Sequence, residues 1–227
     1  MAKVVGILQP GYLPWLGFFE QLHKSDVFVM YDDVQYDKNG WRNRNRIKTV
    51  QGVSWLTVPV KGSTLLNVNQ VLIDNSQPWV RKHLMALRVN YACAAYFKRY
   101  FSLFEKILLR RREKLIELDM ALIKEINAIF GLKRDILFSS ELEIKGDSEG
   151  RLINICKHLG ADIFYEGAAG KNYIEEKKFN EVGIKVEFQD YAHPIYRQLH
   201  GDFVSHLSVI DLIFNEGGES LGIITKK

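Results

Sequence analysis

The sequence has few cysteines, no long apolar run and no signal peptide pattern. Cys93 and Cys156 are its only cysteines, so neither a disulfide framework nor a thiolate metal site is indicated. Both lie in apolar, apparently helical surroundings, and we expect buried thiols. No stretch approaches the roughly 18 uninterrupted apolar residues of a membrane span. The N-terminus lacks an apolar core and a cleavage site, so we expect a cytoplasmic protein.

The sequence also lacks the motifs that mark particular chemistries. It contains no GxxxxGK[ST], GxGxxG, HExxH or GxSxG pattern and no Cys/His pair at the spacing of metal ligands. We therefore expect no metal site and no bound cofactor. The net charge of +4 is mild, which suits a small anionic ligand at least as well as a polyanion such as nucleic acid.

An apolar content of 47% is enough to supply a proper core, and the apolar residues follow recognisable periods. A short apolar run covers residues 3–9, helical spacing follows over 12–24, and a second apolar run covers 27–33. Strand, helix and strand in this order predict a βαβ unit with a right-handed crossover and parallel strands.

The rest of the chain alternates between hairpin and helical patterns. Residues 41–50 and 53–60 have period two, which predicts an antiparallel hairpin. Residues 78–131 predict two or three helices, the last ended by Gly131. The basic run at 110–114 lies inside this region, and we expect it to form a solvated helix face rather than a binding patch.

Two helix and strand pairs follow, and then a final amphipathic helix with Ser205 or Ser208 as N-cap. The fold class is thus α/β, a parallel-strand βαβ core with an antiparallel hairpin and a helical insertion. We expect a single domain over 1–227, with the insertion at about 78–131.

Polar residues gather in turns near the N-terminus. Gln9 ends the first predicted strand and Asp32 and Asp33 end the second, so these residues should be neighbours. In an extended strand Arg42, Arg44 and Arg46 share one face, which requires solvent, carboxylates or a bound anion between the guanidiniums. The candidate site residues of this N-terminal group are Gln9, Tyr12, His23, Asp32, Asp33, Gln35, Asn39, Trp41, Arg42 and Arg44.

A second polar group follows a strand that should end near Gln189. It comprises His193, Pro194, Tyr196, Gln198 and His200. We hypothesise that both groups meet in one cleft, where His193 is a general base and a neighbouring carboxylate raises its pKa. Asp32 and Asp33 are the other candidate catalytic residues, since either carboxylate could also take the proton of an amine acceptor. Tyr196 or Gln198 would hold the acceptor or polarise a carbonyl group. In the alternative interpretation His193 is structural, and its ring donates to the backbone of its own turn.

Four stretches of this sequence, distributed over nearly the whole chain, resemble the WbqC-like protein family. They are "ILQPGYLPWLGFFEQLHKSDVFVMYDDVQYDKNGWRNRNRIK", "WLTVPV", "RLINICKHLGADIFYEGAAGKNY" and "FQDYAHPIYRQLHGDFVSHLSVIDLIFNEG". Members of that family are found in bacterial loci for O-antigen and related surface glycans, where nucleotide-linked deoxyamino sugars receive acyl or aminoacyl groups. The resemblance implies a cytoplasmic sugar-modifying enzyme and, by association, acyl or aminoacyl transfer.

Three functional hypotheses follow. The first is an N-acyl or N-aminoacyl transferase that acts on a nucleotide-linked amino sugar, with an acyl-carrier protein or coenzyme A thioester as co-substrate. The second is a non-catalytic adaptor that binds a carrier protein or a lipid-linked sugar. The third is an RNA-binding protein that uses Trp41, Trp55 and the arginines as a stacking platform. It is the weakest of the three, because acidic residues adjoin the basic ones.

Overall fold

The computed structural model describes residues 1–38, 40–62 and 65–226, and the chain divides into two compact units. Unit 1 comprises Met1–Gln9, Gly17–Asp33 and Lys133–Ala192. Unit 2 comprises Pro10–Leu16, Val34–Leu132 and His193–Lys227. No helix in the described ranges is long and apolar enough to span a membrane. The single-domain organisation stays a prediction.

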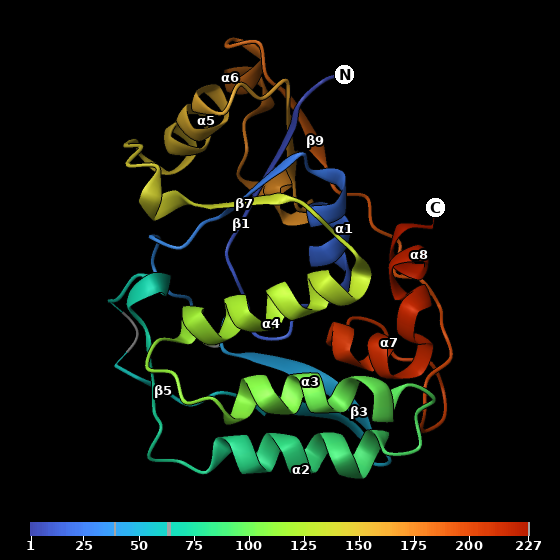
Figure 1. The fold of residues 1–227 in the computed structure, drawn as a ribbon. Coiled ribbons are helices and arrows are strands. Elements are labelled where there is room, and N and C mark those ends of the chain that lie inside the picture. Colours follow the sequence, from blue (N-terminus) through green and yellow to red (C-terminus); the bar gives the residue numbers. More distant parts are fainter. Residues whose placement is uncertain (39, 63–64, 227) are drawn as a thin grey trace. The chain divides into compact units, whose positions relative to one another are not determined.

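Unit 1 is built on a five-stranded sheet in which all neighbouring strands are parallel (Figure 1). In spatial order the strands are β7 (Asp135–Phe138), β2 (Val27–Met30), β1 (Val4–Leu8), β8 (Ile163–Glu166) and β9 (Lys185–Phe188). The prediction of parallel β1 and β2 is confirmed, with Val5 opposite Val27. Asp32 and Asp33 lie just beyond the end of β2.

The helices of unit 1 cover the two faces of this sheet. They are α1 (Leu16–Lys24), α5 (Ser148–His158) and α6 (Glu176–Asn180). On the α1 face, the ring of Phe18 packs edge-on against Phe28 at 5.5 Å between centroids. On the other face, the ring of Phe164 stacks on Phe179 at 5.2 Å. The core of unit 1 therefore lies on both sides of the sheet.

Helix α1 starts four residues later than the sequence predicts. The residue before a proline disfavours the helical region, and Leu13, which precedes Pro14, has a positive φ of 45°. The chain consequently turns over residues 10–15 before the helix begins.

Unit 2 contains the predicted hairpin and the predicted helices. The antiparallel hairpin is formed by β3 (Arg44–Thr49) and β4 (Gly52–Thr57), and a second, short pair by β5 (Val60–Lys61) and β6 (Leu72–Ile73). The helices are α2 (Trp79–Tyr91), α3 (Phe97–Leu109), α4 (Leu115–Phe130), α7 (Val209–Glu216) and α8 (Ser220–Thr225). Short 3-10 helices occur in both units: η1 (Val68–Gln70), η2 (Ser139–Glu141), η3 (Ala168–Asn172) and η4 (Gly217–Glu219).

The helix boundaries agree with two predicted signals. Gly131 ends α4 with a positive φ of 66°, a conformation that glycine adopts without a steric cost. Ser208 is the N-cap of α7, and its hydroxyl accepts a hydrogen bond from the backbone N–H of Ile210 at 3.3 Å.

Two local predictions were wrong. The basic run at 110–114 lies in the connection between α3 and α4 rather than on a helix face, because Arg110 is already extended at the C-cap of α3. Cys93 is exposed, because it lies in the turn between α2 and α3, whereas Cys156 is buried as expected.

Candidate functional site

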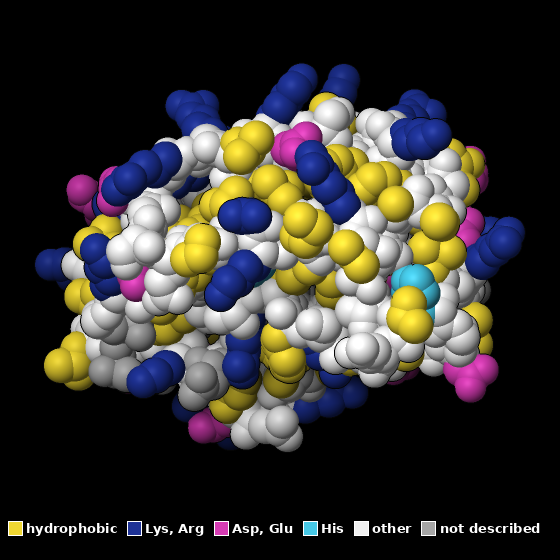
Figure 2. All heavy atoms as spheres, turned by 90° about the horizontal axis from the view of Figure 1, so that it is seen from below, with side chains coloured by type: hydrophobic (Ala, Val, Ile, Leu, Met, Phe, Trp, Pro, Cys, Tyr) yellow, Lys and Arg dark blue, Asp and Glu magenta, His cyan; other side chains and the backbone are white. Residues whose placement is uncertain are grey.

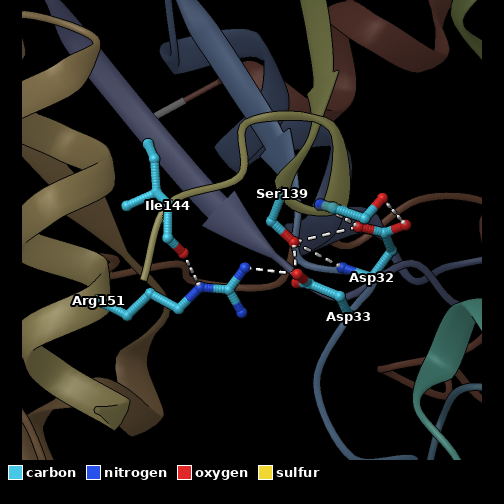
Figure 3. A network of polar contacts seen from close by, with 6 residues as sticks. Asp32, Asp33, Ser139, Ile144 and Arg151 are labelled. Atoms are coloured by element: carbon cyan, nitrogen blue, oxygen red, sulfur yellow. Dashed lines mark hydrogen bonds and ion pairs between the residues drawn. The ribbon is translucent and has the colours of Figure 1, made fainter. Parts of the chain in front are cut away.

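The carboxyl edge of the unit 1 sheet carries the two predicted acidic residues. One oxygen of Asp32 accepts hydrogen bonds from the hydroxyl of Ser139 at 3.1 Å and the backbone N–H of Ser140 at 3.0 Å, and its second oxygen accepts from the hydroxyl of Ser140 at 2.8 Å. Asp33 forms an ion pair of 2.5 Å with Arg151 from α5 and lies 2.5 Å from the Ser139 hydroxyl (Figure 3). This network joins the ends of β2 and β7 to α5.

The contacts of Asp33 stabilise its charged form. Burial alone would raise its pKa, but the hydrogen bonds from Arg151 and Ser139 and the charge of Arg151 outweigh burial, so the pKa of Asp33 is lowered. Ser139 has one hydroxyl proton and can donate it to Asp32 or Asp33 but not to both at once. The network is therefore well suited to fixing the ends of β2 and β7, and a lowered pKa makes Asp33 a weak proton acceptor near pH 7.

A further carboxyl at this edge was missed by the sequence analysis. Glu166 is the last residue of β8, only 5% exposed, and its Oε1 accepts a hydrogen bond of 3.1 Å from the hydroxyl of Tyr173. Burial raises the pKa of Glu166 to about 7, although hydrogen bonds from Tyr173 and the Gly167 backbone act in the opposite direction. A carboxyl of this kind can take up or release a proton near neutral pH.

The position of Glu166 follows from the order of the strands. The chain adds β2 and β7 on one side of β1 and β8 and β9 on the other, so the sheet has a topological switch point between β1 and β8. Ligands of open parallel sheets bind beyond the carboxyl ends of the strands at such a point. Gln9 follows β1 and Glu166 ends β8, so both lie at the carboxyl ends of the strands that flank the switch point.

The signal for Glu166 was present in the sequence. Glu166 ends the apolar run "IFYE" as Asp32 ends an apolar run of its own. Its burial was not predictable, because it depends on the η3 turn. A Cβ atom on Gly170 would lie 2.3 Å from the Glu166 side chain, so a glycine there lets this turn close over the carboxyl.

His23 does not lie with the acidic residues. It is near the C-terminal end of α1, and the connection that follows places Asp26 beside the amino end of β1, where its carboxylate accepts from the Val4 N–H at 2.8 Å. Unit 1 therefore places His23 at the amino edge of the sheet. Burial and the charges of Arg134 and Lys24 lower the pKa of His23, and Glu20 acts in the opposite direction.

Unit 2 brings two tryptophans and two arginines together on the hairpin and in the segment just before it, and we call Trp41, Trp55, Arg44 and Arg46 the hairpin cluster. The two indoles are 5.2 Å apart and 42% and 44% exposed. Arg44 lies over Trp55 at 4.4 Å, and Arg46 lies over Trp41 at 5.3 Å and over Trp55 at 5.9 Å. The expected alternation is confirmed for β3, since Asn45 is buried between the two partly exposed arginines.

Arg42 and Tyr12 support the turn that precedes α1. Arg42 donates to the carbonyl of Pro10 at 3.1 Å, and its own carbonyl accepts from the Tyr12 N–H at 3.0 Å. Burial lowers the pKa of Arg42, while the charges of Asp119 and Asp37 oppose the shift. Tyr12 is fully buried, and its hydroxyl lies 2.9 Å from Nδ1 of His83.

His193 lies in a group of rings that continues from the hairpin cluster. Arg46 donates to the carbonyl of His206 at 3.0 Å, the His206 ring stacks on Trp15 at 5.3 Å, and its centroid lies 5.1 Å from that of His193. Nδ1 of His193 is 3.0 Å from the carbonyl oxygen of Pro194. Since a carbonyl only accepts, Nδ1 carries the proton, as the structural interpretation of His193 expects.

The expected direction of the His193 pKa was wrong. Burial lowers the pKa, the hydrogen bond to Pro194 opposes this, and the nearby His206 lowers it again. The imidazole is therefore neutral at pH 7, the form that can accept a proton on Nε2.

The remaining predicted residues of unit 2 have partners of their own, and the ring of Tyr196 also stacks on that of His193 with 6.4 Å between centroids. The buried Tyr196 donates to Asp211 at 2.9 Å, and the Gln198 side chain forms two hydrogen bonds of 2.9 Å with the backbone of Val204. Gln35 is exposed and forms a bridge with Asn67. Asn39 lies outside the described residues.

Asp32 and Asp33 belong to unit 1, whereas His193, Arg42 and Arg44 belong to unit 2. The hypothesis that they share one cleft therefore stays a prediction. Within the described ranges no group of three or more His, Cys, Asp or Glu side chains is arranged to hold a metal ion.

The chain matches a protein family and a mycobacterial protein over most of its length. The model of the WbqC-like protein family matches residues 9–223. The uncharacterized protein Rv1507c of Mycobacterium tuberculosis is 37% identical over 222 residues, which is 96% of each chain. No solved structure gives a significant match.

Proposed function

Because the chain belongs to the WbqC-like protein family, we propose that it is a sugar-modifying enzyme of bacterial surface-glycan (O-antigen) biosynthesis. It transfers an acyl or aminoacyl group from a thioester, carried by coenzyme A or by an acyl-carrier protein, to the amine of a nucleotide-linked amino sugar. The thioester is a co-substrate rather than a bound cofactor.

The observation that carries this proposal is the hairpin cluster. A nucleotide sugar offers a flat base and a diphosphate, and the cluster offers two half-exposed indoles with two guanidiniums stacked beside them. Indoles stack on bases, and guanidiniums bind phosphate oxygens through paired N–H donors. The nucleotide therefore binds with its base against Trp41 or Trp55 and its diphosphate against Arg44 and Arg46.

His193 is the candidate for the proton transfer. It is joined to the cluster through His206 and Arg46, and its Nε2 is the basic nitrogen because Nδ1 is bound to Pro194. The sugar amine attacks the thioester carbonyl, the C–N bond forms and the C–S bond breaks. Nε2 of His193 takes the amine proton and returns it to the leaving thiolate.

Two other functions remain candidates. The stacked indoles and arginines also suit single-stranded RNA, whose bases stack on aromatic side chains. A non-catalytic adaptor would need a surface for its partner but no proton acceptor. RNA would bind with strong salt dependence and without preference for an amine, and an adaptor would bind without turnover.

The binding experiment is isothermal titration with a thymidine- or uridine-diphosphate-linked amino sugar, compared with the same nucleotide sugar that carries a hydroxyl and with a short oligoribonucleotide. We expect the amino sugar to bind, and Trp55→Ala to weaken its binding at least about 10-fold, since stacking contributes about 1–3 kcal/mol per base. Val50→Ala is the matched control, an exposed residue of the same hairpin. Tight binding of RNA alone would contradict the proposal.

A further inference from the structure

Helix α2 has an exposed face that is both apolar and basic. A groove of about 600 Å³ runs along it, and its lining includes Arg81, Lys82, Met85 and Val89. Met85 is 53% exposed and Val89 70%. These positions are spaced at three to four residues, so they form one stripe along the helix. The groove extends from Pro78 to Asn90, about 20 Å at the rise of an α-helix.

The charged residues that line the groove are both cations, Arg81 and Lys82. Residues 75–104 contain no Asp or Glu but five cationic residues, and in the described part of the chain no carboxylate lies within ion-pair distance of Arg81 or Lys82. Figure 2 views the molecule from the side on which α2 lies in Figure 1, and there Lys and Arg side chains stand among hydrophobic ones.

The two cations lie at the unfavourable end of the helix. Arg81 and Lys82 follow closely after the first residue of α2, Trp79, and the first turn contains no acidic residue. The amino end of a helix has a partial positive charge and favours anions. Pro78, the N-cap, supplies no side-chain hydrogen bond. The fold of α2 alone would favour Asp or Glu at these positions, which indicates a function for the positive charge.

We propose that this face of α2 is the docking surface for the acyl-carrier protein that brings the thioester, through an acidic amphipathic helix of the carrier. The inference rests on the proposed function and specifies its donor. Carboxylates of the carrier helix pair with Arg81 and Lys82 at the amino end of α2. Its apolar side chains pack on Met85 and Val89, which removes both from water.

The features of the surface favour a protein helix over other occupants. The stripe is narrow, about as long as a helix of 13 residues, and has apolar residues at its centre with cations toward one end. An anionic membrane would require cations spread around an apolar face. A second copy of the chain would need an acidic strip that complements α2 on the same protein.

The experiment uses the full-length protein labelled with ¹⁵N and an acyl-carrier protein whose phosphopantetheine carries an acetyl group. We expect amide shifts concentrated in residues 78–90 and a dissociation constant that rises at least about 10-fold between 50 and 500 mM NaCl. Arg81→Glu and Lys82→Glu should each weaken binding about 10-fold or more. Lys106→Glu on α3, the matched charge reversal outside the groove, should change it less than about 2-fold.

Several results would overturn the inference. Amide shifts concentrated outside residues 78–90, or a loss of carrier binding in Lys106→Glu equal to that in Arg81→Glu, would contradict it. So would the absence of carrier binding at high carrier concentration. Binding of phosphatidylserine vesicles, or of a second copy of the chain, through this face in place of the carrier would also contradict it. The two proposals fail separately. Transfer from acetyl-coenzyme A without carrier binding would support the proposed function and contradict the proposed docking surface. Carrier binding at α2 without formation of an acylated amino sugar would support the proposed docking surface and contradict the proposed function.

Discussion

The guanidinium of Arg44 lies over the ring of Trp55, with 4.4 Å between Cζ and the ring centre. Its Nε donates to the carbonyl of Gly40 at 3.3 Å. The stack and this hydrogen bond hold a charged group at the surface with little loss of conformational entropy on ligand binding. Arg44 is thus prepared for an anion before the anion arrives.

Arg44→Ala should therefore weaken binding of the nucleotide sugar by roughly 10- to 100-fold, because a hydrogen bond to a charged group contributes about 1.5–3 kcal/mol. The melting temperature should change by less than about 2 °C, since the side chain lies at the surface. Titration calorimetry and thermal unfolding measure the two effects. Arg44→Lys should bind with intermediate affinity. Unchanged affinity for the nucleotide sugar in both variants would show that Arg44 is a solvated residue that does not contact the ligand.

Arg42→Ala should behave differently from Arg44→Ala. Arg42 holds the turn before α1 through the carbonyl of Pro10, so its removal leaves a buried carbonyl without this donor. We expect a loss of about 1–3 kcal/mol in the free energy of unfolding, measured with urea. If the variant were as stable as the original protein but bound the nucleotide sugar weakly, Arg42 would be a ligand-binding residue like Arg44.

The ion pair of Asp33 with Arg151 predicts a stability that depends on pH. The pKa of Asp33 in the folded protein is lower than in the unfolded chain, so its contribution is fully present above about pH 4 and is lost as pH falls through the folded-state value. Asp33→Asn should cost about 1–2 kcal/mol in urea unfolding at pH 7 and much less at pH 3.

Glu187→Gln is the control for Asp33→Asn. Glu187 forms an exposed ion pair with Lys185, and such pairs contribute less than about 1 kcal/mol. Equal effects of the two substitutions at pH 7 would contradict the structural role of the Asp33 network.

Glu166 predicts the opposite dependence on pH. Burial raises its pKa from 4.5 to about 7, so the contribution of Glu166 to stability is present below pH 4.5 and is lost as pH rises toward 7. Glu166→Gln should remove this loss. Near pH 5 the variant and the original protein should have similar free energies of unfolding, and at pH 8 the variant should be more stable by about 1–3 kcal/mol. A variant less stable at pH 8 would show that the charged carboxylate is the stabilising form.

Much of the fold was predictable from patterns that act locally. The apolar runs that became β1 and β2 flank a helical pattern, and this order allows few arrangements other than a parallel pair. The period-two pattern of residues 41–60 specified the hairpin, and single residues such as Gly131 and Ser208 marked helix ends through their own backbone or side-chain preferences.

The candidate site was less predictable, because the state of a side chain depends on residues distant in the sequence. Asp33 is paired with Arg151, and the turn that contains Gly170 packs against Glu166. No local sequence pattern predicts either contact. The lowered pKa of His193 follows from its burial and from His206, whereas a carboxylate neighbour was expected. The hairpin cluster was partly predictable, since alternation placed Arg44 and Arg46 on one face.

Mass spectrometry of a reaction mixture tests the central claim most directly. The protein is incubated with a nucleotide-linked amino sugar and with an acetyl or aminoacyl thioester, on coenzyme A and on a carrier protein in separate reactions. We predict a nucleotide sugar whose amine has gained the acyl group, with one free thiol released per product. His193→Gln should lower turnover by roughly 10²- to 10⁴-fold with little change in KM. A protein that binds the nucleotide sugar but forms no acylated product from any of these thioesters would contradict the account.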